Sequence, residues 1–96
     1  MSSINRHSKV TVTPDQVSSE VSGEIIILQV KDGMYFGLDD VGAVVWQAIQ
    51  TPRTVDEIVN TMMGEFEVDR EKCQADVCAL LEQMAAAKLV SIENES

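Results

Sequence analysis

"DGMYFGLDDVGAVVWQAI", which runs from Asp32 to Ile49, is the stretch that decides the fold. Its Asp-Gly pair is typical of a hairpin turn, because glycine accepts the positive φ that such a turn needs. Met34–Leu38 then has the aromatic composition of a short strand, and either Asp39 or Asp40 can cap a helix directly after it. This helix has its apolar residues on one face: Val41, Val44, Val45, Ala48 and Ile49. The stretch therefore predicts a strand that passes into a helix without a loop.

Two further strands are predicted before this turn. Glu24–Val30 is rich in β-branched residues and can pair with Met34–Leu38 across the turn. In "KVTVTPDQV", valines alternate with threonines as far as the turn residues Pro14 and Asp15. The three segments together predict an antiparallel meander.

Two more helices are predicted after the first. Pro52 ends the first helix, and Thr54 with Glu57 has the spacing of a capping box that begins the second. Asp69 can cap a third and longest helix, which runs to about Lys88. The apolar stripe of the second helix is Val55, Ile58, Val59, Met62, Met63 and Phe66. That of the third is Cys73, Val77, Leu80, Leu81 and Met84.

The expected fold class is α+β, with a three-stranded antiparallel sheet followed by three helices, which is the winged helix-turn-helix arrangement. We expect it to occupy residues 9–92. Residues 1–8 and 93–96 are polar and lack periodicity, so we expect disordered ends there. Leu89–Glu93 is β-branched and fits either a short strand or a tail.

Length and charge narrow the class of protein. The chain has 96 residues, of which 45% are hydrophobic, and this suits one small globular domain. No apolar run is long enough to cross a bilayer, and no basic segment followed by an apolar one begins the chain. We therefore expect a cytoplasmic protein. The formal net charge of −9 opposes nucleic-acid binding and favours a basic or neutral partner.

Residues suited to catalysis are scarce. The only histidine, His7, lies in the terminal segment, and no spacing of cysteine and histidine predicts a zinc site. Cys73 and Cys78 are separated by about 140° around a helix, so we expect two reduced thiols rather than a disulfide. The glycines are scattered and form no phosphate-binding loop. The sequence thus predicts no enzyme, no metal and no cofactor.

Met34–Leu38 would be the terminal strand of the meander. It contains neither charge nor proline, with which exposed edges are commonly blunted. Gly37 has no side chain to obstruct an incoming backbone, while Tyr35 and Phe36 present apolar surfaces on opposite faces. Such an edge favours β-augmentation, in which a guest peptide adds a strand. In the alternative interpretation, Phe36 and Leu38 pack inward and a chain terminus covers the edge.

The segments "YFGLDDVGAVVWQAI", "TPRTVDEIVNTMM" and "EVDREKCQADVCALLEQMAAAKLV" together resemble the PqqD-like family. These are leader-recognition domains for ribosomally made peptide natural products. The resemblance extends from about Val10 to Ile92. Within the family, the sequence looks most like the stand-alone leader-binding proteins of lasso-peptide clusters.

The resemblance implies that a leader peptide lies antiparallel along Met34–Leu38 as a fourth strand and fills a groove beside the third helix. It also implies that the precursor is presented to a partner leader peptidase or modifying enzyme. Asp76 is placed to pair with a basic leader residue. The peptide-binding residues expected on this basis, some of which would instead form core, are Met34, Tyr35, Phe36, Gly37, Leu38, Cys73, Asp76, Val77, Leu80, Leu81 and Met84. Val41, Val45, Trp46 and Ile49 are assigned to the core.

Two alternatives stand beside peptide binding. One is a DNA-binding winged-helix regulator, and the other is a scaffold domain that self-associates through its free edge. The cations of the third helix are Arg70, Lys72 and Lys88. Its acids, which would face phosphates unfavourably, are Asp69, Glu71, Asp76 and Glu82. The charge balance therefore favours a peptide over DNA.

Overall fold

The computed structural model describes residues 4–14, 16–22 and 24–94. The α+β class is confirmed, with three helices as predicted. The strands are β1 (Lys9–Val12), β2 (Gln16–Val21), β3 (Glu24–Gln29), β4 (Met34–Leu38), β5 (Arg53–Thr54) and β6 (Val90–Glu93). The helices are α1 (Asp40–Ala48), α2 (Val55–Glu65) and α3 (Arg70–Ala86). Of the segments assigned from sequence, residues 1–3, the turn residue Asp15 and residues 95–96 lie outside the described residues.

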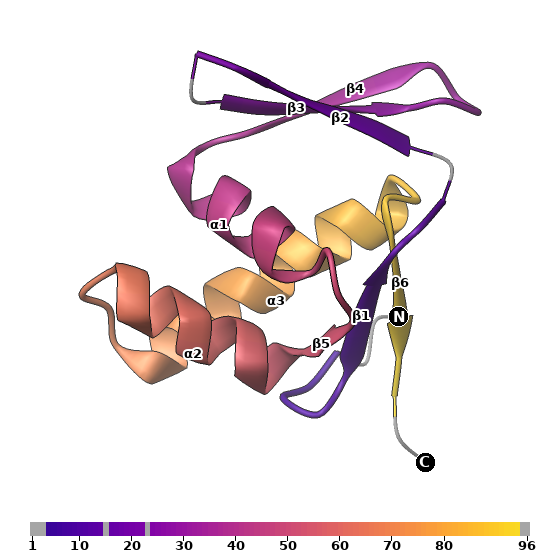
Figure 1. The fold of residues 1–96 in the computed structure, drawn as a ribbon. Coiled ribbons are helices and arrows are strands. Elements are labelled where there is room, and N and C mark those ends of the chain that lie inside the picture. Colours follow the sequence, from indigo (N-terminus) through magenta and orange to yellow (C-terminus); the bar gives the residue numbers. More distant parts are fainter. Residues whose placement is uncertain (1–3, 15, 23, 95–96) are drawn as a thin grey trace.

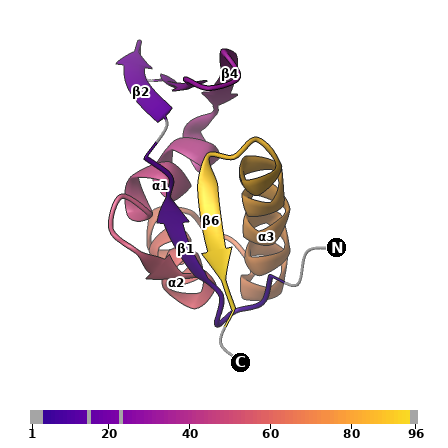
Figure 2. The same cartoon turned by 90° about the vertical axis from the view of Figure 1, so that its right-hand side faces the viewer.

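The described strands form two sheets, which corrects the predicted single sheet followed by helices. One sheet has the order β2-β3-β4 and the other has the order β5-β1-β6. Figure 1 shows the first sheet above the helices, with β1 and β6 running beside them, and Figure 2 shows β1 and β6 side by side. The predicted meander is confirmed for β3 and β4, but the segment predicted as its remaining strand, β1, was wrong. That place belongs to β2, while β1 pairs with β5 and β6.

The physical reason lies in burial. β2 is an edge strand whose residues are almost all exposed, so its sequence lacks the alternation that identifies a strand packed on one face. Val10 in β1, in contrast, is fully buried in the core. Leu89–Glu93, which was predicted to form either a short strand or a tail, contains the strand β6. An apolar pattern identified β1 as a strand without specifying its partner.

The hairpin of β3 and β4 has the predicted pairing and a longer loop than a two-residue turn. Ile25 pairs with Leu38 and Ile27 with Phe36, which places these four side chains on the buried face. Gly33 has the predicted positive φ, at 65°. Val30, predicted to end the first arm, instead belongs to the loop.

A buried glutamine closes this loop. Gln29 is only 3% exposed, and its side-chain oxygen accepts hydrogen bonds from the amides of Lys31 at 2.8 Å and Asp32 at 3.2 Å. The Gly33 amide donates to the Gln29 carbonyl at 2.9 Å. These bonds satisfy a polar group that would otherwise be costly to bury. They fix the start of β4 relative to β3.

The helix caps follow the sequence signals. The Asp39 carboxylate accepts from the Gly42 amide at 2.8 Å, and Thr54 forms a complete capping box with Glu57. Asp69 precedes α3 but makes no side-chain capping bond. At the other end, Lys88 has a φ of 63°, and the chain leaves α3 in the left-handed conformation that commonly ends helices. Local chemistry therefore sets where the helices begin and end.

The core lies between the β2-β3-β4 sheet, the helices and the second sheet. Val45, Trp46 and Ile49 are buried as predicted. Val41 was assigned to the core wrongly, because 42% of its surface is exposed. The buried hydrophobic residues are Val10, Ile25, Ile27, Leu38, Val45, Trp46, Ile49, Val55, Ile58, Val59, Met62, Cys73, Val77, Leu81, Met84, Leu89 and Val90. Within the described residues, no helix has the length and apolar character needed to span a membrane.

The described part of the N-terminal segment packs on the fold, in contrast to the disorder expected for residues 1–8. Ser8 has no exposed surface, and its hydroxyl donates to the side-chain oxygen of Asn94. The carbonyls of Ser8 and Arg6 accept from the amides of Val55 and Asp56, each at 2.9 Å. These are the first two amides of α2, which have no partner inside their own helix. The segment therefore caps α2.

Candidate functional site

The outer edge of β4 is free of backbone partners among the described residues. β4 ends the order β2-β3-β4, and no other described backbone hydrogen-bonds to Met34–Leu38. In an antiparallel strand at an edge, alternate amides and carbonyls point away from the sheet. The opposite edge, β2, includes the charged Glu20, whereas β4 has no charge and no proline. β4 is thus the edge that presents backbone groups without an obstacle.

The side chains of β4 divide between two faces of the sheet. Leu38 is 5% exposed and Phe36 is half-buried against the core, so these two pack inward. Tyr35, on the opposite face, is 73% exposed, and Met34 at the start of the strand is 64% exposed. The alternative interpretation was therefore right that Phe36 and Leu38 pack inward. Among the described residues, no segment pairs with the outer edge of β4, and residues 1–3 and 95–96 lie outside the described part of the chain.

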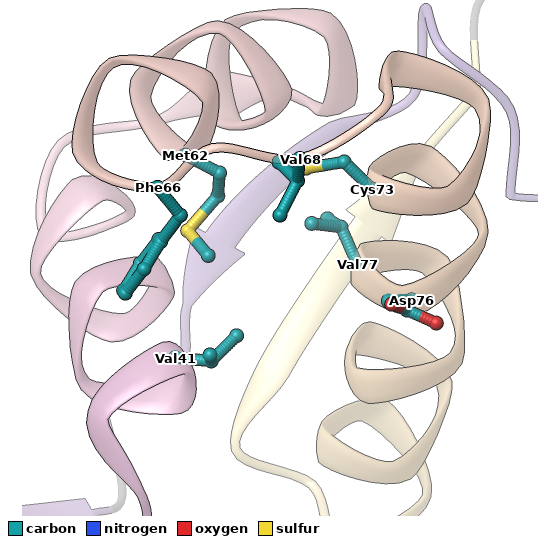
Figure 3. Close-up of a pocket in the computed structure, with 7 residues that line it drawn as sticks. All are labelled: Val41, Met62, Phe66, Val68, Cys73, Asp76 and Val77. Carbon is teal, nitrogen blue, oxygen red and sulfur yellow. The ribbon is translucent and has the colours of Figure 1, made fainter.

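An apolar pocket of about 120 Å³ lies near the point where β4 passes into α1. In Figure 3, Val41 from α1, Met62 from α2 and Val77 from α3 point toward the same space. Val41 is three residues beyond Leu38 in the chain, and no residue of β4 itself lines the pocket. The lining residues are Val41, Met62, Phe66, Val68, Cys73, Asp76 and Val77.

Only part of the predicted helical stripe lines this pocket. Cys73 and Val77 form its α3 wall, with Asp76 beside them. Leu80 is half-buried and packs against the core. Leu81 and Met84 have no exposed surface, so they form the interior beneath the site and offer nothing to a guest in this conformation.

Sequence reasoning missed four lining residues: Val41, Met62, Phe66 and Val68. Met62 and Phe66 belong to the predicted stripe of α2, and a helical period marks a pocket wall and a core position in the same way. The one available signal was the closeness of Val41 to the end of β4 in the chain.

The pocket wall is uncharged except at Asp76. Burial raises the pKa of the Cys73 thiol, and the neighbouring Asp76 carboxylate raises it further. Cys73 is therefore a neutral thiol at physiological pH, and both described cysteines are free. Asp76 lies 3.9 Å from the Lys72 ammonium, with both side chains mostly exposed. The site thus combines an apolar wall with one solvent-facing carboxylate.

A larger depression of about 420 Å³ lies on the far side of the fold, between the N-terminal segment, β6 and the start of α2. Glu57, one of the two acidic residues that line it, is already engaged in the capping box with Thr54. The backbone and hydroxyl of Thr54 hold the pKa of the Glu57 carboxyl below its usual range, with the cations of Arg53 and Lys9 adding to the effect. This depression is shaped by helix capping and has no contact with β4.

The arrangement at β4 is suited to binding a peptide. The residues around the pocket include no histidine and no thiolate that could act as a base or nucleophile. In the part of the chain that the structure describes, no group of three or more His, Cys, Asp or Glu could hold a metal. A free strand edge with an adjoining apolar pocket can take up an extended peptide and one of its apolar side chains.

Comparisons with known proteins give a family match and matches to solved structures. Residues 24–90 match the family of the coenzyme PQQ synthesis protein D (PqqD). No curated protein matches the sequence. The solved structure of TbiB1 in complex with the TbiA(beta) leader peptide superposes with a TM-score of 0.79 at 29% identity, covering 90% of this chain and 98% of that chain. Lasso peptide synthetase B1 complexed with the leader peptide superposes with a TM-score of 0.77. At 18% identity, with 85% of this chain and 96% of that chain covered, the second match shows the fold alone.

Proposed function

The chain belongs to the PqqD family, and on this premise we propose that it binds the leader segment of a ribosomally made precursor peptide of the lasso-peptide type. The leader adds to β4 as a fourth strand of the β2-β3-β4 sheet, antiparallel to Met34–Leu38. Backbone hydrogen bonds to the free edge supply affinity, and pockets beside it supply selectivity. The protein itself catalyses no reaction on the peptide.

The observation that carries this proposal is the free edge of β4 next to the apolar pocket. Guest side chains on the inner face pass over Phe36 and Leu38 and continue toward Val41, Cys73 and Val77. The TbiB1 structure is a complex with a leader peptide, which supports a leader as the guest here. A site of this kind needs no cofactor or metal.

The predicted binding residues have distinct roles in this proposal. Met34, Tyr35 and Gly37 flank the guest strand, while Phe36 and Leu38 form the inner wall next to the pocket. Leu80 is the half-buried neighbour of Val77 on α3, one turn further along. Leu81 and Met84 support this wall from below without touching the guest. Asp76 pairs with a lysine or arginine of the leader, in competition with Lys72.

The bound precursor is presented to a separate leader peptidase or modifying enzyme. This division of labour follows from the absence of a catalytic group around the site, because a cleavage or cyclisation must then come from another protein. The binding unit is the predicted domain of residues 9–92, together with the N-terminal segment that caps α2.

Binding to DNA receives less support from the charges on α3. Arg70 lies 3.4 Å from the Asp56 carboxylate and 2.8 Å from the Asn60 side-chain oxygen, and Lys72 lies 3.9 Å from Asp76. The positive charges of Arg70 and Lys72 are therefore already offset by neighbouring acids. These residues would add little DNA affinity through the release of counterions.

The test is a titration of the isotopically labelled protein, followed by amide NMR. The probes are synthetic leader peptides translated from short reading frames beside the gene, and then a DNA duplex. We expect a leader to shift the amides of Met34–Leu38 and of the α3 residues around Val77, with a Kd in the micromolar range or below (about −8 to −10 kcal/mol). Shifts caused by DNA alone, or a concentration-dependent dimer that no peptide disturbs, would contradict the proposal.

A further inference from the structure

No contact with the described residues requires a glycine at position 37 of β4. Gly33 needs its positive φ of 65°, and Gly42 lies so close to Leu38 that a Cβ would crowd it. Neither of these two requirements for glycine applies at Gly37. Its φ is not in the left-handed region, and a Cβ at this position would meet nothing within 4 Å. Glycine in a strand nevertheless weakens it, because glycine loses more backbone entropy and packs no side chain.

Gly37 alternates along β4 with Phe36 and Leu38, which pack inward, so the open space at Gly37 lies on the opposite face of the sheet. This face, turned away from the helices below the sheet in Figure 1, is here called the outer face. The register aligns Ser19, Ile26 and Gly37 across the three strands on this face. The next row consists of Val17, Leu28 and Tyr35. Ile26 is half-buried and has a small residue on each side, so its flank toward β4 is open.

A fourth strand on β4 would extend these rows by one residue each. Side chains directly opposite in an antiparallel pair lie within contact distance, and a large side chain opposite an edge glycine covers the exposed backbone. The residue opposite Gly37 would thus lie over Gly37, reach Ile26 and have the Tyr35 ring beside it. No other position of β4 on this face leaves such a space, because Tyr35 fills the next one.

We propose that the guest leader places one large aromatic or β-branched side chain opposite Gly37 on the outer face, and that Gly37 thereby sets the register of the guest. This inference rests on the proposed function and deepens it. A slip of one residue would send the anchoring side chain to the inner face and the pocket-filling ones outward. The leader must therefore carry adjacent apolar residues, one for each face.

The test is a selection from a randomised peptide display library against four forms of the protein. Wild type should enrich peptides with a large aromatic or β-branched residue at one position. On Gly37→Val, the selected peptides should instead carry glycine or alanine at that position. The preferences at adjacent peptide positions should be unchanged. A peptide selected on wild type should bind Gly37→Val about fivefold more weakly. Gly37→Ala, which adds a single methyl into open space, should show the same trend with a smaller loss.

Ser19→Val is the matched control, because Ser19 flanks Ile26 from the other side on the far edge of the same sheet. It should leave the selected profile as in wild type. Identical profiles for wild type and Gly37→Val, or a profile that changes with Ser19→Val instead, would overturn the register role of Gly37 while peptide binding stands. If wild type enriches no peptide at all, the proposed function fails together with this inference.

Discussion

Gly42 and Leu38 lie in close contact at the junction of β4 and α1. A Cβ on Gly42 would be 3.1 Å from Leu38 Cδ2 and 3.2 Å from Leu38 Cβ. Leu38 is the last residue of the free edge, and Val41 of the pocket lies next to Gly42 in the chain. This close approach places the end of the edge beside the start of the helix that contributes Val41 to the pocket.

Alanine substitution of two helical glycines tests that contact. In an open helical position, Gly→Ala stabilises a protein by about 1 kcal/mol. We expect this gain for Gly64→Ala, since a Cβ there would meet nothing within 4 Å. Gly42→Ala should lose the gain or become destabilising, because the Leu38 Cβ cannot move without its backbone. Urea unfolding of both variants measures the difference, and equal stabilisation would show that the contact is loose.

The exposed valine of the pocket should control peptide affinity. Val41→Asp places a charge where the apolar guest side chain enters, and we expect binding of a selected peptide to weaken about tenfold or more. The fold should tolerate the change, since Val41 is 42% exposed. Val17→Asp is the matched control, because Val17 is 58% exposed on the outer face of β2, away from the pocket. Calorimetry measures the peptide affinity of both variants. An equal loss of affinity in Val41→Asp and Val17→Asp would show that the peptide does not use the pocket.

The Asp76 carboxylate beside the pocket should contribute to the affinity for a basic leader and contribute little to stability. Its pair with Lys72 is exposed on both sides, so Asp76→Asn should change the free energy of unfolding by no more than about 0.5 kcal/mol. Binding of a leader that contains lysine or arginine should fall about fivefold, with a weaker dependence on salt. Glu82→Gln removes an equivalent charge from α3 outside the pocket lining and should have no such effect. An unchanged salt dependence in Asp76→Asn would contradict the pairing.

Stability should fall in alkaline solution through the buried thiol. Burial, and then Asp76, raises the pKa of Cys73 in the folded state above its ordinary value of 9.0. The unfolded chain therefore ionises first, so the contribution of Cys73 is complete below pH 9 and is lost as the pH rises through the folded pKa. Urea unfolding at pH 7 and pH 10 should show a smaller decrease for Cys73→Ala than for wild type. Parallel decreases would assign the effect to other groups.

The hydroxyl of Ser8 should contribute to stability although it lies in a segment expected to be disordered. It accepts from the Asn5 amide at 2.9 Å and donates to Asn94, and the residue has no exposed surface. Ser8→Ala should cost about 1–2 kcal/mol because it leaves buried polar groups without partners. Ser91→Ala makes the same chemical change at an exposed position of β6 and should be close to neutral. Thermal or urea unfolding of the pair decides between an ordered and a disordered segment.

Features with local causes could be predicted from the residues alone. The turn at Gly33, the pairing of β3 with β4, the cap at Asp39 and the capping box of Thr54 all depend on residues a few positions apart. Hydrogen bonds and backbone preferences over such distances can be inferred from residue types alone.

Which strands share a sheet, and which apolar residues face solvent, depends on packing between elements that are distant in the chain. Lys9 pairs with Glu93 across almost the whole chain, and this pairing removes β1 from the predicted meander and leaves its place to β2. Val41 and Val45 belong to the same apolar stripe of α1, yet Val45 is buried and Val41 opens the pocket. A periodic pattern records that a residue is apolar, whereas burial depends on which distant element packs against it.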